Sequence, residues 1–402
     1  MSSDSLEMIQ NKMPSFTETS FAAVDAVIDQ ALRDKRLVGA VVRVAHQGKT
    51  LYQNAAGLAD RELAQPMAQD TLFRLASVSK PIVSAAAMAL IHQGRLKLDQ
   101  PIASLLPDFR PRLANGEPAT ITIRQLLSHT AGLGYRFLEK DAQGPYARAG
   151  VSDGMDDAAH SLAENLRRLA TVPLLYTPGT SWGYSLAVDV LGAVIEQVCE
   201  QRLDLAVKSL ITDPLKMHDS GFYTDQAQRL ATPYVNDVPQ PHILAENECV
   251  APFEDTAGIY FSPQRAFNSQ AFPSAGAGMV GSAADLLRFL ETLRQGGGGL
   301  ISADLIQEMG RDQTSAAELP DAPGYGFGLG FSVLRDPLAA ESPESEGTWR
   351  WGGAYGHSWF VDRKRELSVV AMTNTLYEGM SGAFVTELRD AVYASINAKS
   401  AS

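Results

Sequence analysis

The sequence predicts an α/β fold of the α+β type, in which a mixed antiparallel sheet is flanked by helices and interrupted by a mostly helical lobe. Two regions rich in β-forming residues, one near each end of the chain, predict the sheet. The middle of the chain carries apolar residues at helical spacing instead. The simplest architecture for this order is one sheet built from both ends of the chain with a helical lobe inserted.

The first quarter of the chain predicts a helix, a hairpin and a second helix. Residues 21–37 carry apolar side chains at helical spacing, which indicates an amphipathic helix. Residues 38–45 and 51–56 are rich in β-forming residues and flank a glycine-containing turn, which indicates a hairpin. Residues 78–93 are apolar and alanine-rich, and Gly94 follows as a signal for the end of a helix.

Three more helices are expected in the middle of the chain. Their apolar faces carry Leu162, Leu166 and Leu169, then Leu191, Ile195 and Val198, and finally Leu286, Leu287, Phe289 and Leu290. Ser282 and Asp285 are placed to cap the last of these helices. The glycine run at residues 296–299 lacks the Lys-Ser/Thr of a phosphate-binding loop, so it is interpreted as a turn.

The C-terminal third returns to β-type sequence. Strands are expected at residues 325–334, 347–352, 358–362 and 367–373. A last helix is expected over residues 381–398, with Ser381 as its N-cap.

These elements divide the chain into two domains. Residues 20–76 and 277–398 are expected to form a discontinuous α/β sheet domain, and residues 77–276 a mostly helical lobe, with the active site at their junction. Residues 1–19 are expected to be a loosely ordered tail.

Composition and charge limit the partners of this protein. The chain has 45% hydrophobic and 20% charged residues, as an ordinary globular protein does. A formal net charge of −12 argues against nucleic acid and against an anionic membrane surface as partners.

The first residues do not resemble a signal peptide, and only Cys199 and Cys249 are present, so a reduced, cytoplasmic protein is expected. No Cys/His cluster has the spacing of a metal site, so neither a metal nor a cofactor is expected. The sequence leaves the oligomeric state open.

The segment Ser77-Val78-Ser79-Lys80 is the sharpest chemical feature of the sequence. Ser77 is placed as the N-cap of the predicted helix, and residues three apart on a helix share a face, so the Lys80 amine should reach the Ser77 hydroxyl. The N-terminus of the helix would stabilise an oxyanion. A lysine base also needs burial, a positive neighbour or a tyrosine that shares the proton. Because Ser-x-x-Lys is common by chance, the spacing alone leaves an ordinary helix start open.

Several segments, in the right order, resemble the serine β-lactamase and penicillin-binding protein superfamily. Residues 72–80 (LFRLASVSK) resemble its nucleophile segment. The other matching segments are residues 126–133 (LLSHTAGL), 178–185 (PGTSWGYS), 213–217 (DPLKM) and 275–279 (AGAGM). The resemblance covers about residues 20–395 and is strongest to class C β-lactamases and, within the superfamily, to family VIII carboxylesterases of the EstB type. It implies a β-lactamase/transpeptidase-like fold.

The resemblance assigns roles to residues that the sequence alone leaves ambiguous. It implies that Tyr184 is the proton-transfer partner of Ser77 and Lys80, and that the Ala354 N–H joins the Ser77 N–H in an oxyanion hole. Without it, Tyr184 is an ordinary packed aromatic residue after a Pro-Gly turn. Ser185 imitates a nucleophile elbow, but its partners would follow in the wrong order.

Two departures from the β-lactamase pattern bear on function. The Asn that normally lies two residues after the tyrosine is replaced by Leu186, and the Lys that opens the strand motif is replaced by Trp351. A substrate carboxylate needs charged or several hydrogen-bonding partners in order to leave water. Trp351 offers an apolar wall and one N–H, which favours an uncharged ester over a penicillin.

Substrate is expected to contact five residues, namely Trp351, Gly352, Gly353, Tyr135 and Trp182. The glycines would let the substrate lie against a strand edge, and the aromatic rings would line an apolar pocket, although such rings are more often part of a core. His357 lies close to this motif in the sequence and is interpreted as structural.

The sequence therefore predicts a serine carboxylesterase that hydrolyses small, short-acyl esters through an acyl-enzyme on Ser77. Three alternatives stay open: a β-lactamase or D-peptidase, an acyltransferase on the same fold, and a binding or scaffold protein that has lost activity.

Overall fold

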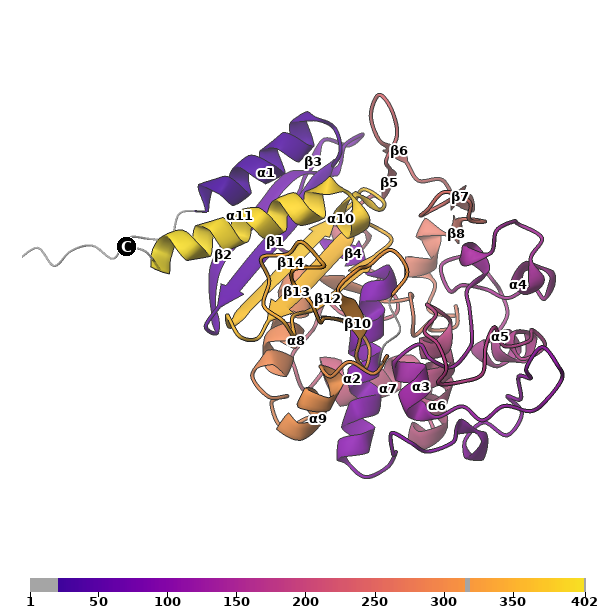
Figure 1. Ribbon diagram of the computed structural model, residues 1–402. Coiled ribbons are helices and arrows are strands. Elements are labelled where there is room, and N and C mark those ends of the chain that lie inside the picture. Colours follow the sequence, from indigo (N-terminus) through magenta and orange to yellow (C-terminus); the bar gives the residue numbers. More distant parts are fainter. Residues whose placement is uncertain (1–20, 315–318, 401–402) are drawn as a thin grey trace, which may run out of the picture.

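The structure is a computed structural model that describes residues 21–314 and 319–400 (Figure 1). The tail predicted over residues 1–19 lies outside these ranges. Most buried hydrophobic residues of the described chain belong to a single core cluster, and a second apolar cluster lies between the sheet and the helices formed by the two ends of the chain.

The main sheet has eight strands in the order β10-β11-β12-β13-β14-β1-β2-β3, and each neighbouring pair is antiparallel. Its strands are β1 (Gly39–His46), β2 (Lys49–Asp60), β3 (Gln65–Pro66), β10 (Tyr325–Phe327), β11 (Ser332–Leu334), β12 (Trp349–Gly353), β13 (His357–Asp362) and β14 (Leu367–Thr373). The two ends of the chain meet where β1 pairs with β14, from Ala40 opposite Thr373 to His46 opposite Leu367. Every residue of β14 is buried, as expected for a central strand covered on both faces.

Helices cover both faces of this sheet. Helices α1 (Ala22–Arg33) and α11 (Ala383–Ser400) pack against each other on one face, and α8 (Ala283–Arg294) packs on β1 and β14 from the other (Figure 1). Short helix α10 (Glu378–Ser381) precedes α11, and α9 (Ala303–Met309) follows α8.

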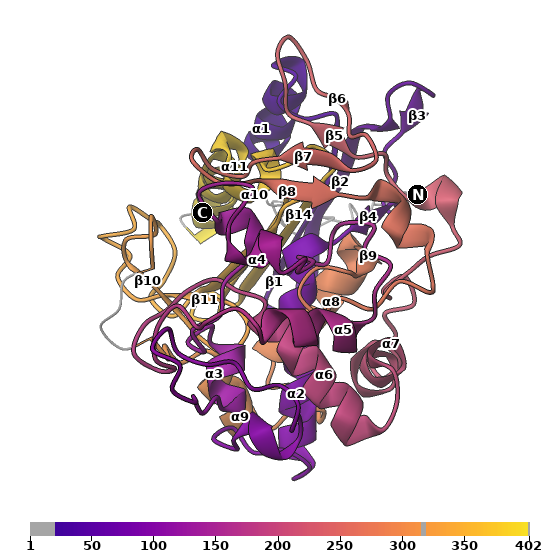
Figure 2. The same cartoon turned by 90° about the vertical axis from the view of Figure 1, so that its right-hand side faces the viewer.

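In the segment between β4 (Leu72–Arg74) and β9 (Val280–Ser282), which pair with each other, most of the regular secondary structure is helical. Its helices are α2 (Ser79–His92), α3 (Ile123–Leu127), α4 (Pro145–Arg148), α5 (Leu162–Leu169), α6 (Ala187–Cys199) and α7 (Leu203–Val207). Two hairpins also lie here, β5 (Tyr234–Val235) with β6 (His242–Ile243), and β7 (Glu248–Val250) with β8 (Ile259–Phe261); Figure 2 shows β7 and β8 above α4. Residues 79–90 of α2 are all buried, and their many alanines let α6 and α7 approach closely.

This architecture confirms the predicted α+β fold class and most of the predicted elements. The strand at residues 367–373 has the predicted bounds, and the Ser282 side chain accepts a hydrogen bond from the Asp285 N–H as the predicted cap of α8. The division into a sheet domain (20–76 and 277–398) and a helical lobe (77–276) stays a prediction.

Three local predictions are wrong. Residues 325–334 form two strands, because Gly330 turns the chain with a φ of 109°. Ser381 ends α10 instead of capping the last helix, and extended Gly382 separates α10 from α11. Ser77 lies inside a 3-10 turn over Ala76–Val78, so Val78 takes the N-cap position of α2. The Ser77 hydroxyl does not cap α2 and accepts hydrogen bonds from Lys80 and Tyr184 instead.

Candidate active site

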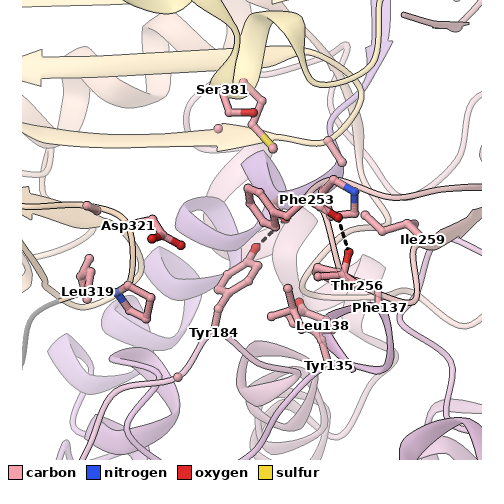
Figure 3. Close-up of a pocket in the computed structure, with 18 of the residues that line it drawn as sticks. Tyr135, Phe137, Leu138, Tyr184, Phe253, Thr256, Ile259, Leu319, Asp321 and Ser381 are labelled. Atoms are coloured by element: carbon pink, nitrogen blue, oxygen red, sulfur yellow. Dashed lines mark hydrogen bonds between the residues drawn. The ribbon is translucent and has the colours of Figure 1, made fainter. Parts of the chain in front are cut away.

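A cavity of about 1350 Å³ contains Ser77 in its wall and lies beside strand β12. Its lining is mainly apolar and includes residues from three loops, at 137–146, 252–259 and 319–325. In Figure 3, Phe253 and Ile259 lie on one side of Tyr184, and Leu319 on the other. An apolar cavity with few polar groups around a hydroxyl is typical of a small-molecule site.

Ser77 and Lys80 lie at the beginning of α2 as their spacing predicts. The Lys80 Nζ donates to Ser77 Oγ at 3.2 Å and to the carbonyl oxygen of Gly276 at 2.8 Å. Lys80 is fully buried, so its amine has been removed from water and depends on these partners. The helix places the amine one turn from the hydroxyl, and Gly276 fixes its position from a distant segment.

Tyr184 completes the arrangement from the segment that leads into α6. Its hydroxyl donates to Ser77 Oγ at 2.6 Å, although the two residues are 107 positions apart in the sequence. Lys80 Nζ lies 4.7 Å from the centre of the Tyr184 ring. The structure therefore gathers an amine, a phenol and a hydroxyl, which together can move a proton away from Ser77.

Ser77 and Ala354, the residues of the predicted oxyanion hole, both line the cavity. Ala354 lines the cavity directly after β12, and its own carbonyl accepts the Tyr377 N–H at 3.1 Å, which holds this turn in place. Ala76, directly before Ser77, has a φ of 46°, a left-handed conformation that strains a residue other than glycine. The oxyanion hole of the Ser77 and Ala354 N–H groups stays a prediction.

The predicted substrate-binding residues lie in different surroundings. Trp351, Gly352, Trp182 and Tyr135 line the cavity. Trp351 packs against Tyr184, with ring centres 5.3 Å apart, and its indole N–H has no hydrogen-bond partner in the described chain.

Gly353 and Tyr135 support the packing around Ser77 and Tyr184. A Cβ on Gly353 would lie 2.4 Å from the Leu75 carbonyl oxygen, so the missing side chain lets β12 approach the turn that carries Ser77. Tyr135 is only 3% exposed and lies behind Tyr184, with ring centres 5.0 Å apart. Burial, together with the nearby Tyr184 and Asp189, raises the pKa of the Tyr135 phenol well above its usual value.

The two histidines near the site are both buried. His357 Nε2 lies 2.8 Å from the Arg74 carbonyl oxygen, and Nδ1 accepts the Thr373 N–H, so the ring joins strands, as its structural interpretation expected. Burial lowers the pKa of His357 to about 4, although the bond to Arg74 opposes this effect. Burial also lowers the pKa of His129 well below its usual value, with a further contribution from Lys80.

Ser185 is fully buried, and its Oγ lies 3.1 Å from His129 Nδ1. It does not line the cavity, which argues against the nucleophile-elbow interpretation.

The sequence analysis missed two features beside Lys80. The Gly276 carbonyl was matched only as a structural signature, and Asp189 was not noticed. Asp189 is 1% exposed on α6, and a Cβ on Gly276 would lie 2.5 Å from its Oδ2 and 3.3 Å from Lys80 Nζ. An acidic residue among Val188, Val190 and Leu191 was the available signal, because a buried carboxylate needs a reason to be there.

Within residues 21–314 and 319–400, no group of acidic, histidine or cysteine side chains is arranged to hold a metal ion. In the same part of the chain, none of the helices combines the length and the apolar character needed to cross a membrane. Cys199 and Cys249 are both free thiols.

Comparisons with known proteins agree with this fold. The family model described as Beta-lactamase matches residues 24–394. Esterase EstB from Burkholderia gladioli is 51% identical over 374 residues, which are 93% of this chain and 95% of that protein.

Solved structures give the same picture. The structure of "EstCE1, a hydrolase with promiscuous acyltransferase activity" superposes with a TM-score of 0.92 at 45% identity, covering 94% of this chain and 100% of that one. Unliganded simvastatin synthase (LovD) from Aspergillus terreus, at 20% identity and a TM-score of 0.71 over 93% of this chain and 98% of that one, shares the fold. On the evidence of its motifs, its fold and these matches, the chain belongs to the beta-lactamase family.

Proposed function

We propose that this protein is a serine carboxylesterase that hydrolyses small, uncharged, short-acyl esters through an acyl-enzyme on Ser77. The observation that carries the proposal is the convergence of two groups on one oxygen: Lys80 Nζ at 3.2 Å and the Tyr184 hydroxyl at 2.6 Å from Ser77 Oγ. A hydroxyl held between an amine and a phenol in a mainly apolar cavity is arranged for nucleophilic attack.

Acylation begins when Ser77 Oγ attacks the ester carbonyl carbon while its proton passes to the pair formed by Lys80 and Tyr184. The carbonyl oxygen becomes an oxyanion, which the N–H groups of Ser77 and Ala354 stabilise. The C–O bond to the alcohol then breaks, and the pair returns the proton to the leaving oxygen. Water attacks the acyl-enzyme by the same sequence, which releases the acid and restores Ser77.

The cavity favours an ester over a β-lactam. Trp351 and Leu186 occupy the positions where β-lactamases hold polar groups, and Leu186 is 1% exposed, so neither side chain supplies a charge to balance a substrate carboxylate. The 51% identity with a protein named as an esterase supports the same substrate class.

Acyl transfer to an alcohol is the second candidate. It is favoured by the 45% identity with a structure titled as a hydrolase with promiscuous acyltransferase activity, and by the apolar walls that would admit an alcohol beside the acyl-enzyme. Product analysis with an added short alcohol decides between the two, because transfer yields a new ester and hydrolysis yields only the acid.

The function is tested with a panel of p-nitrophenyl esters of increasing acyl length, beside nitrocefin, using the wild type and Ser77→Ala. We expect hydrolysis of the short esters, little opening of nitrocefin and complete loss of activity in the variant. A fluorophosphonate should label the wild type once per chain and leave the variant unlabelled. Nitrocefin opening as efficient as ester hydrolysis would support the β-lactamase alternative, and absence of labelling the scaffold alternative.

A cytoplasmic location is part of the same proposal. Both cysteines are free thiols, which suits a reducing compartment.

A further inference from the structure

A buried carboxylate lies next to the proposed base and has no role in the mechanism above. Asp189 is 1% exposed, and its Oδ1 accepts a hydrogen bond from the equally buried Ser274 hydroxyl at 2.7 Å. Oδ2 has no partner with normal hydrogen-bond geometry in the described chain, although the backbone N–H of nearby Gly276 also favours the ionised carboxylate. A buried carboxylate with one neutral hydrogen bond is unfavourable unless a positive charge compensates it.

Lys80 supplies that charge across a single glycine. The position of a Cβ on Gly276 would be 2.5 Å from Asp189 Oδ2 and 3.3 Å from Lys80 Nζ, so both groups border the space that the missing side chain of Gly276 leaves open. Lys80 also donates to the Gly276 carbonyl at 2.8 Å. Glycine is required here because any side chain would fill the space between the carboxylate and the amine.

Three charged or titratable side chains face Asp189: Lys80 from α2, Arg265 from the 3-10 turn over Pro263–Phe267, and Tyr135 from the cavity wall. Arg265 is engaged with backbone carbonyl oxygens, at 2.8 Å from that of Asp156 and 2.7 Å from that of Phe272. Lys80 is therefore the cation beside Asp189 that also contacts the nucleophile.

We propose that Asp189 is a positioning residue of the esterase site, whose carboxylate balances the charge of Lys80 across Gly276 and so sets the pH range in which Ser77 is activated. This inference rests on the proposed function of Ser77, Lys80 and Tyr184. Burial raises the pKa of Asp189, whereas the Ser274 hydrogen bond and the charge of Lys80 oppose that rise, so the ionised carboxylate depends on these two neighbours.

Two substitutions are expected to move the pH dependence in opposite directions. Asp189→Asn keeps the shape and an oxygen for the Ser274 hydroxyl but removes a negative charge beside the proposed base, and loss of a nearby negative charge favours release of a proton. Its kcat/KM profile should shift down by about one pH unit. Ser274→Ala keeps the charge but removes the hydrogen bond to the ionised carboxylate, so the profile should shift up by a smaller amount.

The test is kcat/KM against pH for p-nitrophenyl butyrate, measured with the wild type and both variants. Asp285→Asn is the matched control, because Asp285 is also a buried carboxylate that accepts from a serine hydroxyl, that of Ser220 at 3.0 Å, but it lies on α8. Its profile should match the wild type.

An Asp189→Asn profile that coincides with the wild type would overturn the proposal, since a merely structural carboxylate changes stability and not the titration. If that variant does not fold, Ser274→Ala carries the test, and an unshifted or downward-shifted profile overturns the proposal. Activity that persists in Ser77→Ala would reject the proposed function itself. If Ser77→Ala is inactive and the kcat/KM profile of Asp189→Asn coincides with that of the wild type, only the role of Asp189 is rejected.

Discussion

Replacement of Tyr184 by phenylalanine separates the chemistry of this side chain from its packing. The substitution deletes the hydroxyl that lies 2.6 Å from Ser77 Oγ. The ring keeps its contacts, with centres 5.0 Å from Tyr135 and 5.3 Å from Trp351, and with Lys80 Nζ 4.7 Å away. The stability cost is therefore about 1 kcal/mol, that of one hydrogen bond.

The catalytic cost should be much larger. A positioned acid or base contributes about 10²- to 10⁴-fold to the rate, which corresponds to about 3–5 kcal/mol of transition-state stabilisation. We expect kcat/KM for p-nitrophenyl butyrate to fall by that factor in Tyr184→Phe, mainly through kcat. Thermal unfolding should change by only a few degrees.

Tyr176→Phe is the matched control for this measurement. It deletes a hydroxyl that donates to the His129 carbonyl oxygen at 3.1 Å, outside the contacts of Ser77, and should leave kcat close to that of the wild type. The reasoning is refuted if Tyr184→Phe retains more than about a tenth of the wild-type kcat/KM, because a proton-transfer partner cannot be dispensed with so easily.

Three further outcomes are expected. The pKa of His357 is about 4 in the folded protein and about 6.5 in the unfolded chain, so between these pH values only the unfolded chain binds the proton. The free energy of unfolding should therefore fall by about 3 kcal/mol as the pH drops from 6.5 to 4. Urea unfolding measures this decrease, which His357→Gln should lack. Gly353→Ala should lower both the melting temperature and kcat, because its Cβ would lie 2.4 Å from the Leu75 carbonyl oxygen, whereas Gly221→Ala, with its nearest atom at 3.7 Å, should be tolerated in the same assays. Trp351→Ala should reduce kcat/KM for butyrate esters about tenfold by removing an apolar wall of the cavity, and an unchanged value would exclude a substrate contact.

Features that depend on near neighbours in the chain could be predicted from the sequence. Runs of β-forming residues around a glycine-containing turn identified the hairpin of β1 and β2, and the β-type stretch at residues 367–373 identified β14 with the right bounds. Helix periodicity predicted that Lys80 would lie beside Ser77, since three residues span almost one turn. The errors at Ser381 and Gly330 are also local, because a single glycine that ends or turns an element is ambiguous in the sequence.

The rest of the candidate site was decided by packing between distant segments. Resemblance to a family was the only basis for assigning roles to Tyr184 and Ala354. Nothing in the sequence adjacent to either residue specifies its position relative to Ser77. The Gly276 carbonyl and the Asp189 carboxylate reach Lys80 from separate segments, so no spacing in the sequence encodes those contacts. Helix geometry fixed the amine beside the hydroxyl, whereas the phenol and the buried carboxylate were placed by the core that holds α2, α6 and β12 together, because close-packed contacts form between surfaces and not along the chain.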